Sequence, residues 1–189
     1  MPNWTGNQLR ITGSAKEIAR FKKQARYTRE DRSIEGKLVK TECEFCFEPF
    51  LPMPEQLMTM HSGCITIKGV QYDNWYTING VDVGLTTEDK AGLIKKYGYK
   101  DWYERNCNVL GTKWDVDGVL ECSRTTELGY TFQSAWAPPA EGILAVSEQY
   151  PELKFNLSFE LEEGGGGEYT MKNGKVLEES SFKASAEEE

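Results

Sequence analysis

Four residues between positions 43 and 64 have the types and the spacing of a zinc site. Cys43 and Cys46 form one pair, and His61 and Cys64 form a second pair. Zinc takes four such sulfur and nitrogen ligands in a tetrahedron. The first pair lies in the alternating run 42–48, which predicts a strand, and residues three apart on a strand point to opposite faces. We therefore expect reduced structural thiols and no metal or other cofactor, with this zinc set as the weaker alternative.

The sequence gives little support to the hypothesis that the protein is an enzyme. His61 is the single histidine, so an imidazole base would have to be this residue, and no motif places a nucleophile beside it. Cys64 lies three residues after His61, so a catalytic Cys–His pair stays an alternative. The run Gly164–Gly167 lacks the spacing of a phosphate-binding loop and precedes a strand, not a helix. The sequence assigns no catalytic residue, and a protein that is not an enzyme is favoured.

Aromatic and polar residues form a more promising set. An indole ring offers a flat surface for stacking and one N–H donor, and a charged neighbour can contact the polar edge of a ligand. A sheet can present such rings to bases or to a small molecule. The alternative is that these rings belong to the core, where large aromatic residues usually lie. The predicted binding residues are Asn3, Trp4, Thr112, Lys113, Trp114, Asp115 and Trp136.

The elements that must position these residues alternate between strands and helices. Period-two alternation predicts the strands, and capping residues followed by apolar residues at helical spacing predict the helices. Asn173-Gly174 predicts a tight hairpin. The expected strands are 5–12, 42–48, 119–124, 129–136, 153–162, 169–172 and 175–177, and the expected helices are 14–27, 86–98, one around 102–106, and 138–150. A polar loop is expected from the end of the first helix to residue 40, and residues 55–85 are expected as an inserted loop or hairpin. This order predicts an α+β fold with helices on one face of a mainly antiparallel sheet.

Length, composition and charge restrict the class of protein. A chain of 189 residues with 39% hydrophobic residues can bury a core, and it has no apolar run that could span a membrane. Five cysteines and a start without signal-peptide features predict a cytoplasmic protein with reduced thiols. The net charge of −8 disfavours nucleic acid and anionic lipid as partners. Residues 1–40 nevertheless contain more basic than acidic residues, so this segment could form a local anion-binding site.

Several runs carry a family resemblance. They are Pro2-Asn3-Trp4, Leu9-Arg10-Ile11-Thr12-Gly13, Phe50-Leu51-Pro52-Met53-Pro54-Glu55, Gly111-Thr112-Lys113-Trp114-Asp115, Phe132-Gln133-Ser134-Ala135-Trp136-Ala137-Pro138-Pro139, Tyr150-Pro151-x-Leu153 and Gly167-Glu168-Tyr169. In these runs the chain resembles the YubB-type ferredoxin-like domain family, which is found on plasmids and phages. The resemblance implies a ferredoxin-like sheet without an iron–sulfur cluster. It implies no activity, since the family has none established, and residues 56–100 depart from its compact members.

These observations lead to one domain and one preferred function. We expect a ferredoxin-like α+β domain over residues 1–178, with an insertion at about 56–100, and an acidic disordered tail over 179–189. The resemblance implies a phage or plasmid protein in the host cytoplasm. We predict non-enzymatic binding of a host protein, which could counter host defence, and the acidic charge favours a basic partner patch. The alternatives are a sponge for a small nucleotide-like signal and an enzyme degrading such a nucleotide. The oligomeric state and the binding face stay open.

Overall fold

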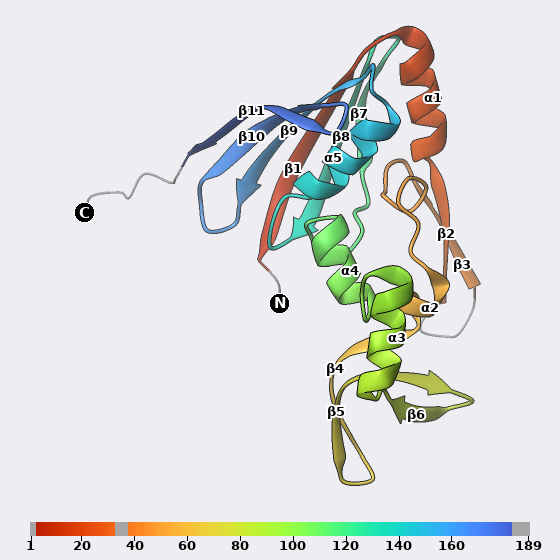
Figure 1. The fold of residues 1–189 in the computed structure, drawn as a ribbon. Coiled ribbons are helices and arrows are strands. Elements are labelled where there is room, and N and C mark those ends of the chain that lie inside the picture. Colours follow the sequence, from red (N-terminus) through yellow and green to blue (C-terminus); the bar gives the residue numbers. More distant parts are fainter. Residues whose placement is uncertain (1–2, 33–37, 183–189) are drawn as a thin grey trace. The chain divides into compact units, whose positions relative to one another are not determined.

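The computed structural model describes residues 3–32 and 38–182 (Figure 1). The chain divides into two compact units. The first combines the segment up to Leu51 with the segment from Leu110 onward, and the second is Pro52–Val109. The second unit is wider than the expected insertion at 56–100. No helix in the described ranges is long and apolar enough to cross a membrane.

The first unit is built on one antiparallel sheet. Among the described residues its strands follow the order β11-β10-β9-β1-β8-β7. A separate hairpin consists of β2 and β3. The elements are β1 (Trp4–Thr12), α1 (Ala15–Ala25), β2 (Tyr27–Arg32), β3 (Leu38–Cys43), β7 (Val119–Arg124), β8 (Glu127–Ala135), α5 (Ala140–Gln149), β9 (Lys154–Leu161), β10 (Gly166–Lys172) and β11 (Lys175–Phe182).

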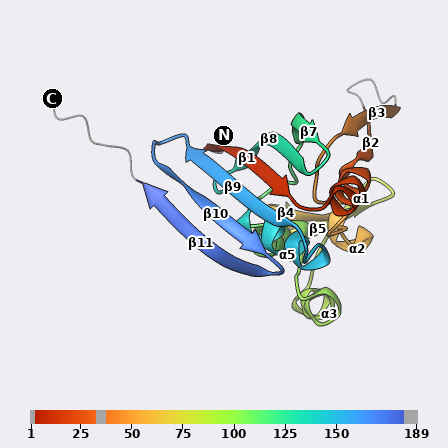
Figure 2. The ribbon, with the colours of Figure 1, turned by 90° about the horizontal axis from the view of Figure 1, so that it is seen from above.

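Alternation in the strands separates a buried face from an exposed face. In β1, residues Leu9 and Ile11 are buried, whereas Gly6 and Gln8 are exposed. Helices α1 and α5 lie on the same side of the sheet (Figure 2). Phe21 of α1 is at the centre of their core, with its ring packed against those of four aromatic residues: Phe45, Phe50, Tyr150 and Phe155. The predicted α+β fold with a mainly antiparallel sheet is confirmed.

Turns and caps explain where several elements of this unit begin and end. The Ser14 hydroxyl accepts a hydrogen bond from the Glu17 N–H at the start of α1. Asn173 and Gly174 both have positive φ, which is the backbone of the tight turn that joins β10 to β11. The sequence pattern predicted both features.

Three expectations about the elements of this unit were wrong. Residues 28–32 and 38–40, expected as part of a polar loop, lie in β2 and β3, which pair with each other. The strand expected over 42–48 ends at Cys43 as β3, and the chain bends after it. Residues 179–182, expected in a disordered tail, pair with β10 as part of β11. The rest of that expected tail, 183–189, lies outside the described residues.

The second unit has its own small sheet and core. Its elements are α2 (Glu55–Met58), β4 (Met60–Ile67), β5 (Val70–Ile78), β6 (Val81–Gly84), α3 (Thr87–Tyr97) and α4 (Trp102–Val109). Strands β4, β5 and β6 pair antiparallel in that order. The buried residues Leu57, Met60, Leu85 and Leu93 form the core. The region expected as an inserted loop or hairpin is thus a helix followed by a three-stranded sheet, within the described residues.

Candidate functional site

The first unit brings three of the five tryptophans together. Trp4 begins β1, Trp114 lies in the loop before β7, and Trp136 follows β8. Strands β1 and β8 are antiparallel, and Trp4 lies opposite Ala135 in their register. The Trp136 N–H donates to the Asn3 carbonyl over 2.8 Å. The ring centroids of Trp4 and Trp114 are 6.0 Å apart. We call these three residues the tryptophan cluster.

Thr112 holds the loop that carries Trp114 in place. Its hydroxyl accepts from the Ala135 N–H over 3.0 Å and donates to the Ala135 carbonyl over 2.9 Å. The loop is therefore fastened to the end of β8, beside Trp136. Thr112 itself is buried, so its side chain positions the cluster and does not face solvent.

The rings of the cluster are exposed to solvent. Trp4, Trp114 and Trp136 have 40%, 39% and 45% of their surface accessible, values far above those of core residues. Exposed apolar residues that gather on a monomer often mark a binding surface, and tryptophan is enriched among the residues that dominate binding energy. The alternative that these rings belong to the core does not fit these values.

Lys113 places a positive charge on the cluster. Its Nζ lies 4.5 Å from the ring centroid of Trp114 and 5.2 Å from that of Trp136. A cation within about 6 Å of an indole face is attracted by the quadrupole of the ring. Two of the three rings thus already contact a cation, which comes from the chain itself.

The backbone at Trp136 adopts a conformation that non-glycine residues rarely use. Its φ is +72°, in the left-handed region. A side chain there costs of order 1–3 kcal/mol, and such residues concentrate at functional sites. The strained residue in this case is an exposed tryptophan, which contributes little to the core.

Asp115 and Asn3 have structural partners. The Asp115 carboxylate accepts from the N–H groups of Phe47 at 2.8 Å, Glu48 at 3.1 Å and Val116 at 2.8 Å. Burial raises the pKa of Asp115 above its ordinary value, although these three N–H donors act in the opposite direction. Asp115 therefore holds the turn after β3. The Asn3 amide donates to the Glu163 carboxylate, on the turn after β9.

A cavity of about 960 Å³ lies beside Trp4 on the face of the sheet that α1 and α5 do not cover. We call this face the open face. It consists of the outward residues of the central strands: Gly6, Gln8, Thr131, Gln133, Ser158, Glu160 and Glu168. The ionisable residues lining the cavity are Asp115, Asp117, Glu160 and Glu168, and among the described residues no Lys or Arg lines it. The site is a hollow, acidic sheet face that has Trp4 of the tryptophan cluster at one end.

The sequence prediction included the cluster but missed the open face. The alternation in 153–162 already indicated that Ser158 and Glu160 lie opposite the apolar residues of that strand. It could not indicate that outward residues of β1, β8, β9 and β10 share one cavity, because that depends on strand order.

The residues of the expected zinc set are divided between the two units. Cys43 and Cys46 are buried in the first unit, whereas Cys64 is exposed in the second. A hydrogen bond between the two buried thiols lowers the pKa of Cys43 and raises that of Cys46. The expectation that they point to opposite faces was wrong, because β3 ends at Cys43. In the described ranges, no group of three or more His, Cys, Asp or Glu is placed to hold a metal ion.

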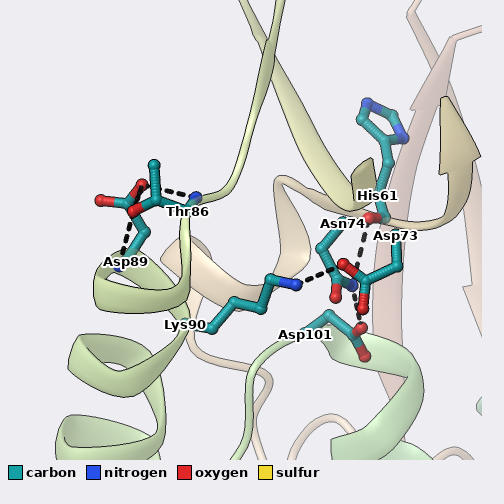
Figure 3. Close-up of polar contacts among 7 residues, drawn as sticks. All are labelled: His61, Asp73, Asn74, Thr86, Asp89, Lys90 and Asp101. Atoms are coloured by element: carbon teal, nitrogen blue, oxygen red, sulfur yellow. Dashed lines mark hydrogen bonds and ion pairs between the residues drawn. The ribbon is translucent and has the colours of Figure 1, made fainter. Parts of the chain in front are cut away.

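The second unit contains a polar network that we assign to its folding (Figure 3). The buried Asn74 amide donates to the Asp101 carboxylate and, at 3.5 Å, to the His61 carbonyl. Asp101 also accepts from the Glu104 N–H at 2.7 Å, which caps α4. An ion pair between Lys90 and Asp73 joins α3 to β5.

The other polar contacts of this unit are also local. Thr86 and Asp89 form a reciprocal capping box at the start of α3. The ring of His61 stacks on that of Trp75 across the β4–β5 pair, with 3.9 Å between the ring centroids. These groups hold strands and helices of the unit together, so we place the candidate site in the first unit.

Comparison with known proteins gives a family likeness for the second half of the chain. Residues 101–189 match the family model described as the ferredoxin-like domain in Api92-like protein. The crystal structure of the protein api92 from Yersinia pseudotuberculosis is similar over 98% of this chain and 100% of that chain, with a TM-score of 0.52 and 12% sequence identity. Identity this low supports the fold alone. No curated protein matches the chain. The fold is therefore ferredoxin-like, and residues 101–189 resemble the ferredoxin-like domain of Api92-like proteins.

Proposed function

We propose that this chain is a non-enzymatic binding protein that contacts a partner protein through the tryptophan cluster and the adjoining open face. The observation that carries the proposal is the gathering of Trp4, Trp114 and Trp136 from three distant segments into one exposed cluster. A partner that covers exposed indoles removes their apolar surface from water, which stabilises the complex. Indole rings also supply a large contact area with few rotatable bonds.

The shape and the charge of the surface favour a protein over a phosphate-bearing ligand. The cavity is lined by residues of β8, β1, β9 and β10, and its ionisable lining residues are acidic. Carboxylates repel phosphate groups and attract basic groups, which also accelerates encounter with a partner of opposite charge.

The origin and the biological role belong to the same proposal. The motif resemblance to the YubB-type family supports a plasmid or phage source, and a host protein is then the natural partner in the host cytoplasm. Binding such a protein would counter or redirect a host defence. The acidic character of the whole chain agrees with a partner that carries a basic patch.

A small nucleotide-like ligand is the second candidate, and one observation favours it. The tilted rings of Trp4 and Trp114, with Lys113 beside them, could stack on a base and contact a phosphate. The acidic lining of the neighbouring cavity counts against it, so it is the weaker candidate.

Native mass spectrometry of the full chain purified from expressing cells separates the two candidates. We expect the wild type to carry a protein partner, and the double variant Trp114→Ala/Trp136→Ala to lose it. Tyr27→Ala, which removes a similarly exposed aromatic residue from β2, is the control and should keep the partner. Release of a nucleotide on denaturation would support the second candidate. A double variant that retains the partner would contradict the assignment of the site.

A further inference from the structure

The position of Lys113 suggests what the tryptophan cluster binds. Its ammonium lies within 5.2 Å of the ring centroids of both Trp114 and Trp136. These exposed rings are therefore already arranged as a site for a cation. Building on the proposed function, we infer that the bound part of the partner is a basic peptide segment, and that one of its Lys or Arg side chains replaces Lys113 on these rings.

The charges of the open face favour the same class of ligand. Asp117, Glu160 and Glu168 are exposed and line the cavity that begins at Trp4. Asp115, the fourth acidic lining residue, is occupied by backbone N–H groups. Further along the sheet, two of the basic residues are paired: Arg10 lies 3.0 Å and Arg124 lies 3.8 Å from the Glu127 carboxylate. A peptide on this face thus meets three exposed carboxylates.

The floor of the cavity leaves room for a peptide main chain. Gly6 lies in β1 between Glu160 of β9 and Gln133 of β8. A Cβ atom at Gly6 would meet only a backbone oxygen, at 4.0 Å. Since Ser158 is also small, these two positions of β1 and β9 carry little side-chain bulk. An extended segment can therefore lie across β1 and β9, with its basic side chains directed to Glu160 and Glu168.

The test is a fluorescence titration of the full chain with a ten-residue peptide of alternating lysine and serine, because the exposed indoles report on binding. We expect a change in tryptophan emission, with an affinity that falls as salt is added. The same peptide with every lysine acetylated should bind at least about tenfold more weakly. Equal affinity for both peptides, or binding of adenosine triphosphate in preference to them, would overturn the inference.

Three variants locate the binding on this face. Glu160→Gln/Glu168→Gln should bind the lysine peptide at least about tenfold more weakly, whereas Glu152→Gln, at an exposed carboxylate outside the cavity, should bind it almost like the wild type. Gly6→Leu fills the cavity without meeting the core and should block binding while the protein stays folded. A peptide that binds Gly6→Leu as well as the wild type is bound elsewhere, and the inference fails.

The variant Lys113→Met tests whether the peptide displaces the Lys113 ammonium from the rings or requires it for binding. If the lysine of the peptide takes the place of Lys113, this variant should bind the peptide severalfold more tightly. Weaker binding would overturn the replacement. If the lysine peptide does not bind while Trp114→Ala/Trp136→Ala still loses the cellular partner, this inference fails and the proposed function stands. If the double variant keeps the partner, the proposed function fails.

Discussion

The rings of Trp4 and Trp114 lie 6.0 Å apart, although most of the chain separates the two residues in sequence. The contact exists because the loop after residue 110 is fastened by Thr112 to the end of β8, and β8 pairs with β1. The cluster is thus supported by strand pairing and by backbone hydrogen bonds, and its rings contribute little to the core.

Trp114→Ala should lower the free energy of unfolding of the first unit by only about 1–2 kcal/mol, because the ring is 39% exposed. Phe21→Ala, at the centre of the aromatic core, should lower it by about 3–5 kcal/mol. Urea unfolding of both variants checks this difference. A loss for Trp114→Ala as large as that for Phe21→Ala would mean that the ring is a core element.

Trp136→Gly should be more stable than Trp136→Ala by about 1 kcal/mol, because only glycine adopts a positive φ without a steric penalty. Both variants lose the ring, so the comparison isolates the backbone strain. Thermal unfolding of the pair measures the difference. Equal stability would show that the left-handed conformation at this position carries no cost.

Asp115 should make stability depend on pH in a defined direction. Burial raises its native pKa above the ordinary value of 3.8, so the native state holds this proton more tightly than the unfolded chain. The contribution of Asp115 to the free energy of unfolding is therefore largest below the pKa that Asp115 has in the unfolded chain. It is lost as pH rises through the pKa that Asp115 has in the native state.

The matched comparison for Asp115 is Asp115→Asn, which does not titrate at this position. The stability of the wild type relative to this variant should decrease as pH rises from about 3.5 to 7. Urea unfolding of both proteins across that range measures it. An advantage of the wild type that increases with pH would mean that the three backbone donors outweigh burial.

Leu157→Asp should unfold the first unit. Leu157 is fully buried in β9, and an unpaired buried carboxylate costs at least about 4 kcal/mol, a large share of the stability of a domain. Leu161→Asp is the control, because Leu161 ends the same strand and is 37% exposed. Circular dichroism should show a folded Leu161→Asp protein. A folded Leu157→Asp protein would show that this side of β9 is not packed.

Two helical glycines should respond to alanine in opposite directions. At Gly142 in α5 a Cβ atom would lie 2.8 Å from the Phe47 ring, so Gly142→Ala should destabilise the first unit by about 1–3 kcal/mol. At Gly92 in α3 nothing lies within 4 Å, so Gly92→Ala should stabilise the second unit by about 0.5–1 kcal/mol. Urea unfolding checks both signs, and a stabilising Gly142→Ala would show that the Phe47 ring moves aside.

Features that depend on neighbours along the chain could be predicted from the sequence. The buried residues of β9, the hairpin turn at Asn173-Gly174 and the capping box of Thr86 and Asp89 all agree with their local patterns. Side-chain direction alternates along any strand, and caps satisfy the first N–H groups of any helix, so no distant contact is needed. Together these features were sufficient for the α+β class.

Strands without an apolar pattern could not be predicted in this way. The expectation of a polar loop was wrong for β2 and β3, because Tyr27–Arg32 alternates no apolar residues and is held by pairing with its partner strand. The strands of the second unit likewise expose most of their residues, so their burial pattern is weak. Pairing between backbones does not require an apolar side chain, and it therefore leaves no periodic signal.

The sequence by itself determined which residue types were available for the site, and it singled out Lys113 between a small polar residue and Trp114. Only the tertiary structure decided what each of them does. Strand pairing placed Trp4, Trp114 and Trp136 together on the surface, and the turn after β3 brought backbone N–H groups to Asp115, which became a supporting residue. The reason is physical: exposure and hydrogen-bond partners depend on segments far apart in the chain, and no local pattern records which of those segments will meet.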